Sequence, residues 1–265
     1  MTNNRVTEEL TSMSLGDHLE ELRARLILAL TGVVLALIIS LAVGGWFVKL
    51  LMLPYEFAAD RAGIEPNMQA FKTMEKFMIY LKASMILAVI LASPWIIYQI
   101  WLFVSAGLYK QEKRFVYIVT PLSAGLFIIG VVFFLFVVAP LVLAFAITFQ
   151  LPGLDYIEYK PQISDYINVV LTLTLVFGIA FQSPIAIVFA ERMGLVSIET
   201  LVQNRKFVLL GVFVISAVVT PPDVISQILL AVPLYALFES SILFCRIWKK
   251  KRQDQDNNSK EDAEL

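Results

Sequence analysis

The amino-acid sequence predicts an all-α protein that crosses a membrane several times. Of its 265 residues, 58% are hydrophobic and only 16% are charged. Several apolar runs stay free of charged residues over the length of about 20 residues that an α-helix needs to cross a bilayer. A soluble domain with one anchor has a single such run, so their repetition indicates a polytopic membrane protein.

A short amphipathic segment, residues 14–26, precedes the first apolar run. Ser14 and Asp17 have the spacing of a helix N-cap and a carboxylate that reaches back to it. We expect this helix to continue without a break into the first span, 26–48, after a polar and mobile N-terminus, 1–13. Its apolar stripe, at helical spacing, consists of Leu15, Leu19, Leu22 and Leu26.

Five further apolar runs complete a six-helix membrane domain over residues 14–248. The third is longer than a bilayer requires and has to tilt or kink, with Pro121 and Pro140 as candidates. The fifth is only about 20 Å long as a helix, which is short for a hydrocarbon core of about 30 Å. The runs are predicted at 76–104, 115–149, 166–190, 207–219 and 224–247.

Two segments between and after these spans have mixed polarity. Residues 49–75 combine apolar and charged side chains, and we expect short surface helices there. Residues 249–265 are first basic and then polar, and we expect a disordered cytoplasmic tail.

The distribution of Lys and Arg predicts that both termini are cytoplasmic. Basic residues are frequent before the first span, in the links between spans two and three and between spans four and five, and after span six. The three opposite loops carry fewer. The basic residues on the predicted cytoplasmic side are Arg5, Arg23, Arg25, Lys110, Lys113, Arg114, Arg192, Arg205, Lys206, Arg246, Lys249, Lys250, Lys251 and Arg252.

Enzyme signatures are absent from the sequence. It has no phosphate-binding loop, no zinc-protease motif and no nucleophile elbow. His18 and Cys245 are the single histidine and the single cysteine, which excludes a multi-histidine metal centre and an intramolecular disulfide. We therefore predict a protein that is not an enzyme and uses neither a metal nor a cofactor.

Two polar residues lie deep within predicted spans. Glu239 lies roughly 22 Å from the outer end of span six, and Gln182 lies at similar depth in span four. An ionisable group there indicates a functional role by default, although a hydrogen-bonded packing role fits Glu239 equally well. For Gln182 an interhelix hydrogen bond is the simpler interpretation.

Three acids lie among basic residues of the predicted cytoplasmic surface: Glu20, Glu21 and Glu112. By spacing alone they are ordinary solvated charges, and Glu21 with Arg25 forms a favourable i,i+4 pair. No spacing argument joins Glu21 to Glu112.

Several blocks, in order along residues 14–248, resemble the multispanning TatC-type subunit of the twin-arginine protein translocase. Each block is weak alone, but their combination is specific. The blocks are His18-Leu19-x-Glu21-Leu22-Arg23-x-Arg25-Leu26; Tyr98-Gln99-x-Trp101-x-Phe103; Leu108-Tyr109-Lys110-x-Glu112-x-Arg114; Phe177-Gly178-x-x-Phe181-x-x-Pro184; Thr220-Pro221-Pro222-Asp223-x-x-Ser226-Gln227; and Pro233-x-Tyr235-x-x-Phe238-Glu239.

The resemblance implies a cup-shaped, six-helix protein of the bacterial inner membrane that exports folded proteins independently of Sec, driven by the proton-motive force. It implies that Glu21 and Glu112 bind the arginine pair of a signal peptide, with Arg23 and Phe103 beside them. It also implies single-span TatA- and TatB-type partners, whose helices contact spans five and six near Thr220 and Gln227.

The sequence departs from the family pattern in span four, where Gln182 replaces a common glutamate and cannot titrate. Two alternatives remain open at this point. A secondary transporter of small solutes or ions would use Glu239 as its proton site, and an intramembrane protease would need Glu239 for cleavage.

Overall fold

The computed structural model describes residues 15–107, 113–149, 160–219 and 224–261. Within these ranges the chain is α-helical apart from short connections, one π-helical turn and one isolated β-bridge. This confirms the predicted all-α architecture. The predicted mobile N-terminus, 1–13, the cap residue Ser14 and the site residues Glu112 and Thr220 lie outside the described residues.

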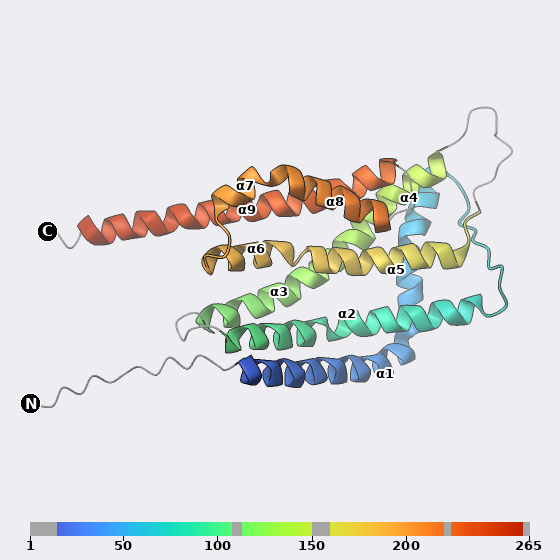
Figure 1. Ribbon diagram of the computed structural model, residues 1–265. Coiled ribbons are helices and arrows are strands. Elements are labelled where there is room, and N and C mark those ends of the chain that lie inside the picture. Colours follow the sequence, from blue (N-terminus) through green and yellow to red (C-terminus); the bar gives the residue numbers. More distant parts are fainter. Residues whose placement is uncertain (1–14, 108–112, 150–159, 220–223, 262–265) are drawn as a thin grey trace, which may run out of the picture.

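The first helix, α1, runs from Leu15 to Ala62 and changes direction along its course (Figure 1). The amphipathic segment continues into the first span, as predicted. The short surface helices that we expect after residue 49 are replaced by the same helix, which passes through Pro54. The reason is packing: four residues at helical spacing after residue 50 are buried, and their contacts offset the hydrogen bond that proline removes. They are Leu51, Tyr55, Ala58 and Ala59.

The second span is α2, Glu75–Ala106, close to its predicted bounds. The third span consists of α3, Lys113–Phe133, a π-helical turn η1, Phe134–Val138, and α4, Ala139–Thr148. Pro140 explains the π turn, because proline provides no N–H and its ring clashes with the carbonyl four residues earlier. The long third span is thus interrupted next to one of the two predicted prolines.

The fourth span is divided into α5, Ile163–Ala180, and α6, Ser183–Arg192. Pro184 lies in the first turn of α6, where a missing N–H is tolerated. A helix that the sequence analysis does not predict, α7, follows at Ile198–Gln203. It begins at Ser197, whose hydroxyl oxygen accepts a hydrogen bond from the backbone N–H of Thr200.

The last two helices are α8, Arg205–Val219, and α9, Val224–Glu261. Helix α9 extends beyond the predicted end of span six, so residues 249–261 have a helical backbone where we expect a disordered tail. No Gly or Pro follows Pro233. Adding residues to an existing helix also avoids the unfavourable nucleation step.

The helices form an elongated bundle whose two ends differ (Figure 1). The start of α1 and the end of α9 lie at one end, together with the end of α2, the start of α3 and the α6–α7 connection. The end of α8 and the start of α9 stop short of the other end. Five helical segments, counting α3–α4 and α5–α6 as one each, are long and apolar enough to cross a membrane, and α8, with 15 residues, is shorter. This arrangement is consistent with six crossings.

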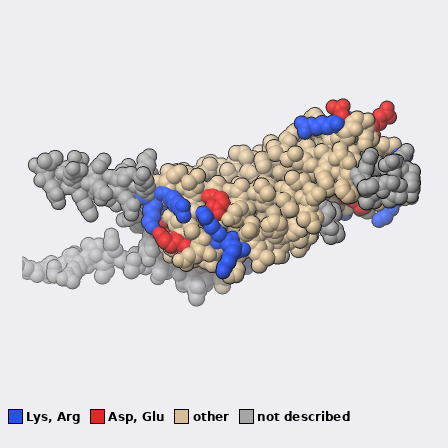
Figure 2. Space-filling view, turned by 90° about the horizontal axis from the view of Figure 1, so that it is seen from above, with Lys and Arg blue, Asp and Glu red and all other residues tan. Residues whose placement is uncertain are grey.

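Charged side chains on the face shown in Figure 2 gather toward the two ends of the molecule, with uncharged surface between them. Many large apolar side chains on the helices are solvent-facing, for example Ile38 at 65% and Ile118 at 64% exposure. An apolar band between two charged ends is the surface that a bilayer-spanning bundle requires. The structure therefore supports the predicted membrane protein.

Two connections at the end opposite the termini are tied together by one buried carboxylate. Glu75 accepts hydrogen bonds from the backbone N–H groups of Phe71, Lys72 and Ser164, at 2.7, 2.9 and 3.1 Å, and from Nε2 of Gln162 at 2.9 Å. The β-bridge between Gln69 and Gln162 lies beside it. Residues 67–75 and 160–164 are therefore one hydrogen-bonded unit.

Candidate functional site

Glu21 lies near the start of α1 and forms an ion pair within its own helix. Oε1 of Glu21 is 2.7 Å from Nε and 2.7 Å from Nη2 of Arg25. Both side chains are about one-quarter exposed, 26% for Glu21 and 28% for Arg25. The i,i+4 pair expected from the spacing is thus formed, and it is partly shielded from solvent.

Arg25 also joins α1 to α2. Its Nη1 donates a hydrogen bond to Oε1 of Gln99 at 3.3 Å, and Gln99 is only 2% exposed. Closer to the helix ends, the His18 ring stacks on the Phe103 ring, with centroids 4.4 Å apart and an interplanar angle of 25°. These two contacts fix the face of α1 that carries Glu21 against the end of α2.

The arrangement leaves one carboxylate oxygen available. Oε2 of Glu21 accepts no hydrogen bond from the described part of the chain, because both contacts from Arg25 reach Oε1. A carboxylate can receive a planar guanidinium through two parallel hydrogen bonds. Glu21 therefore keeps an acceptor for a cationic ligand on α1, three residues after His18, whose ring stacks on Phe103.

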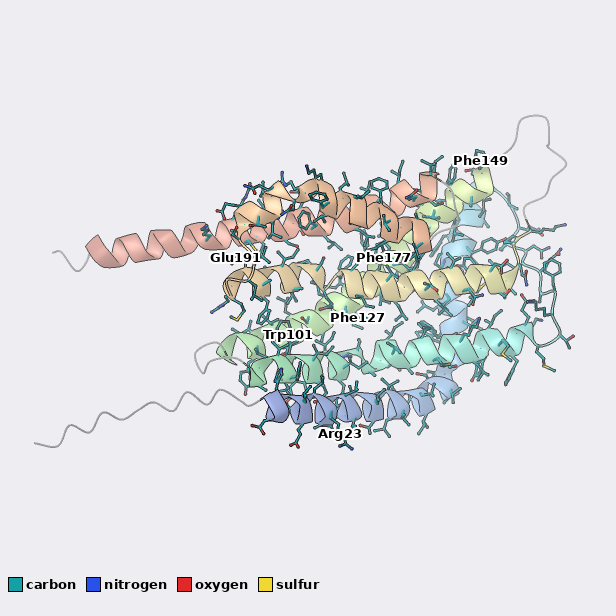
Figure 3. All side chains as sticks on the ribbon, in the orientation of Figure 1. Arg23, Trp101, Phe127, Phe149, Phe177 and Glu191 are labelled. Carbon is teal, nitrogen blue, oxygen red and sulfur yellow. The ribbon has the colours of Figure 1, made fainter. Side chains whose placement is uncertain are left out.

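Two other residues predicted for this site, Arg23 and Glu112, are not seen beside Glu21 in the described part of the structure. Arg23 is exposed, and Figure 3 shows its side chain on the face of α1 turned away from α2. Glu112 lies outside the described residues. Arg25 is the predicted i,i+4 partner of Glu21, whereas Gln99 and His18, present only in the motif blocks, hold this part of α1 against α2.

Gln182, between α5 and α6, makes an interhelix hydrogen bond. Its Nε2 donates to the backbone carbonyl of Ser123 in α3 at 3.0 Å. The Ser123 hydroxyl in turn accepts from Nε1 of Trp101 in α2, which is labelled in Figure 3, at 3.0 Å. Trp101 packs edge-on against Phe189, with ring centroids 5.3 Å apart. Three separate helices are joined at Ser123, which corresponds to the packing interpretation of Gln182.

Glu239 is not an isolated acid. Its Oε2 accepts a hydrogen bond from Nη2 of Arg205 at 2.8 Å, and its Oε1 accepts one from the Tyr235 hydroxyl at 2.8 Å. Arg205 is the first residue of α8, so this ion pair links the two last helices. The transporter alternative would use Glu239 as its proton site, and in the structure both oxygens of this carboxylate have a hydrogen-bond donor.

Gln227 in α9 forms a hydrogen bond to α8, the other helix of the last hairpin. Its Nε2 donates to the carbonyl of Phe213 in α8 at 3.0 Å. The hydrogen bond of Gln227 therefore joins α8 and α9. In the described part of the chain, no group of three or more His, Cys, Asp or Glu side chains could hold a metal ion.

Comparison with known proteins identifies the family of this chain. Residues 17–233 match the family model of the Sec-independent protein translocase protein TatC. The chain belongs to the TatC family. A TatC protein from Desulforapulum autotrophicum is 36% identical over 250 residues, which cover 94% of this chain and 90% of that protein. TatC from Escherichia coli K12 is 34% identical over 239 residues, 90% of each chain.

Solved structures of TatC have the same fold. A crystal structure described as the twin-arginine translocase receptor TatC superimposes with a TM-score of 0.76 at 32% identity and covers 87% of this chain and 98% of that chain. A second structure, of TatC in DDM, gives a TM-score of 0.77 at 33% identity. The family is a component of Sec-independent protein translocation and not a catalytic enzyme, so the protease alternative has no support.

Proposed function

We propose that this TatC-family chain is the signal-recognition and scaffold subunit of an exporter for folded proteins in a bacterial inner membrane. It binds twin-arginine signal peptides on the cytoplasmic face through Glu21 and Glu112, and export is driven by the proton-motive force. Both termini are cytoplasmic and the chain crosses the membrane six times. The location of both described chain ends at one end of the bundle supports this topology.

The observation that carries this proposal is the half-paired carboxylate of Glu21. It has one oxygen without a hydrogen bond from the described chain, and His18, three residues before it on α1, stacks on the aromatic ring of Phe103 on α2. A guanidinium pairs well with a carboxylate and stacks well on an aromatic face. A peptide with two consecutive arginines would satisfy both groups, with Glu112 as the second carboxylate.

The same chain would hold the TatA- and TatB-type single-span partners on its last hairpin, near Thr220 and Gln227. Helix α8 supports this role, because it is short and presents a row of exposed apolar side chains at helical spacing. A short span also thins the adjacent bilayer, which favours helix association there. The exposed side chains are Phe207, Leu210, Val214, Ile215 and Val218, and their exposed fractions are 51–81%.

Charge reversal tests the proposal. Glu21→Lys and Glu112→Lys, singly and together, are expressed with the partner subunits, and photo-crosslinking and export of a twin-arginine precursor are measured. We expect both signals to be lost in the double variant. Glu20→Lys is the matched control, since Glu20 is exposed on the same helix. Crosslinking that persists in the double variant refutes the assignment of the site.

A further inference from the structure

Glu21 already holds a guanidinium, that of Arg25, in the signal-free protein. Nε and Nη2 of Arg25 are each 2.7 Å from the same oxygen, Oε1. A signal arginine therefore meets a carboxylate whose charge is neutralised by a cation attached one helical turn away. Entry of a second guanidinium places two like charges beside one carboxylate, which is unfavourable in a partly shielded site.

The structure also provides another partner for Arg25. Its Nη1 donates a hydrogen bond to Oε1 of Gln99 in α2 at 3.3 Å, and Gln99 is buried. This nitrogen differs from the two, Nε and Nη2, that contact Glu21. A guanidinium has five N–H donors. Arg25 can therefore leave Glu21 and keep a hydrogen bond to Gln99.

We propose that Arg25 is a built-in competitor for the signal arginine and thereby a specificity-determining residue of the receptor. The inference rests on the proposed function, because it requires Glu21 to bind the signal. A ligand must displace Arg25 to gain the whole carboxylate. A guanidinium, with its planar fork, competes for that oxygen pair better than the compact ammonium of lysine. Arg25 thus raises the selectivity for arginine over lysine.

This competition predicts a gain of affinity when Arg25 is removed. A partly exposed ion pair is a weak competitor, so Arg25→Gln should tighten binding of a twin-arginine peptide about two- to fivefold. A peptide in which one arginine is lysine should gain more than the twin-arginine peptide. Gln99→Leu should act in the opposite direction, because a displaced Arg25 then loses its second partner.

The experiment measures dissociation constants of fluorescent twin-arginine and lysine–arginine signal peptides for the full-length protein in lipid nanodiscs. Arg246→Gln, which removes an exposed charge from α9, is the control for net charge and should leave the relative affinities unchanged. The thermal unfolding temperature of each variant tests whether it is folded.

The outcomes distinguish the competitor role of Arg25 from the proposed binding of the signal by Glu21. Tighter binding by Arg25→Gln, together with reduced arginine selectivity, supports the competitor role. Weaker or unchanged binding by a folded Arg25→Gln variant overturns it and leaves Arg25 as a residue that only orients Glu21. If Glu21→Gln binds both peptides as the unmodified protein does, the proposed function itself fails, whatever Arg25→Gln shows.

Discussion

The contact between α3 and α5 depends on two glycines, and adding one methyl group there tests how the bundle is packed. At Gly130 in α3, a Cβ atom would lie 2.7 Å from the carbonyl oxygen of Phe177 and 2.9 Å from Cγ of Phe181. The nearest atom belongs to the backbone of α5, so it cannot rotate away. At Gly178 in α5, a Cβ atom would lie 2.8 Å from Cε2 and Cζ in the ring of Phe127 in α3, which is labelled in Figure 3.

The loss of stability caused by Gly130→Ala can be estimated by comparison with Gly125→Ala. Gly125 is in the same helix, and a Cβ atom there would have no atom within 4 Å. Both Gly→Ala changes gain helix propensity of about 1 kcal/mol, so this contribution cancels in the difference. Gly130→Ala must in addition push α3 and α5 apart by roughly 0.5 Å, and overpacking of this kind costs about 1–3 kcal/mol. Gly130→Ala should therefore be less stable than Gly125→Ala by that amount.

Thermal unfolding of the two variants in the same detergent measures this difference. With about 2–4 °C per kcal/mol for a chain of this size, Gly130→Ala should unfold at a temperature about 2–12 °C below Gly125→Ala. Equal unfolding temperatures would refute the close approach of the two helices. A lower temperature for Gly125→Ala would do so as well.

Three further predictions concern ion pairs and buried carboxylates. Glu75→Ala should speed hydrogen–deuterium exchange in residues 67–75 and 160–164 while α9 is unaffected, and unchanged exchange would contradict the shared role of this carboxylate. Alanine substitutions of Glu239 and Arg205, combined in a double-mutant cycle of unfolding free energies, should give a coupling of about 0.2–1 kcal/mol, and zero coupling would contradict the ion pair. The pKa of Glu199 is lowered from 4.5 by a hydrogen bond from its backbone and by Lys249, so its carboxyl ¹³C signal should titrate below that value, and Lys249→Gln should shift the midpoint upward. Because the folded pKa is depressed, the contribution of this pair is present above pH 4.5 and is lost as the pH falls through the folded pKa.

The sequence was sufficient for the membrane architecture because uncharged runs of bilayer length have few alternative structures. The details that it missed depend on packing. Pro54 and the charges after it are typical of a helix end, yet buried contacts of Leu51 and Tyr55 continue α1 to Ala62. Helix α7 had a local signal in Ser197, three residues before Thr200, but its six residues are too few for a periodic pattern.

In the candidate site, the sequence identified the polar residues but not most of their partners on other helices. Gln182 and Glu239 were recognisable as polar groups within predicted spans, whereas Glu21 was marked only by the family resemblance. Their partners across helices, such as Arg205 for Glu239, depend on how each helix is rotated about its axis, which a pattern along one chain does not specify. The Glu21–Arg25 pair was predictable because both members lie on one helix at a spacing of four.

The pairing of Glu21 differs from that of two other carboxylates, Glu75 and Glu239. The oxygens of Glu75 accept four hydrogen bonds and those of Glu239 accept one each, so both carboxylates are fully used in holding segments together. Glu21 is paired through Oε1 alone, and its partner Arg25 has a second acceptor in Gln99. A carboxylate whose pairing is both incomplete and replaceable can exchange its cation, whereas one enclosed by backbone donors cannot. The proposed role of Glu21 in signal recognition therefore rests on ligand exchange rather than on depth in the membrane.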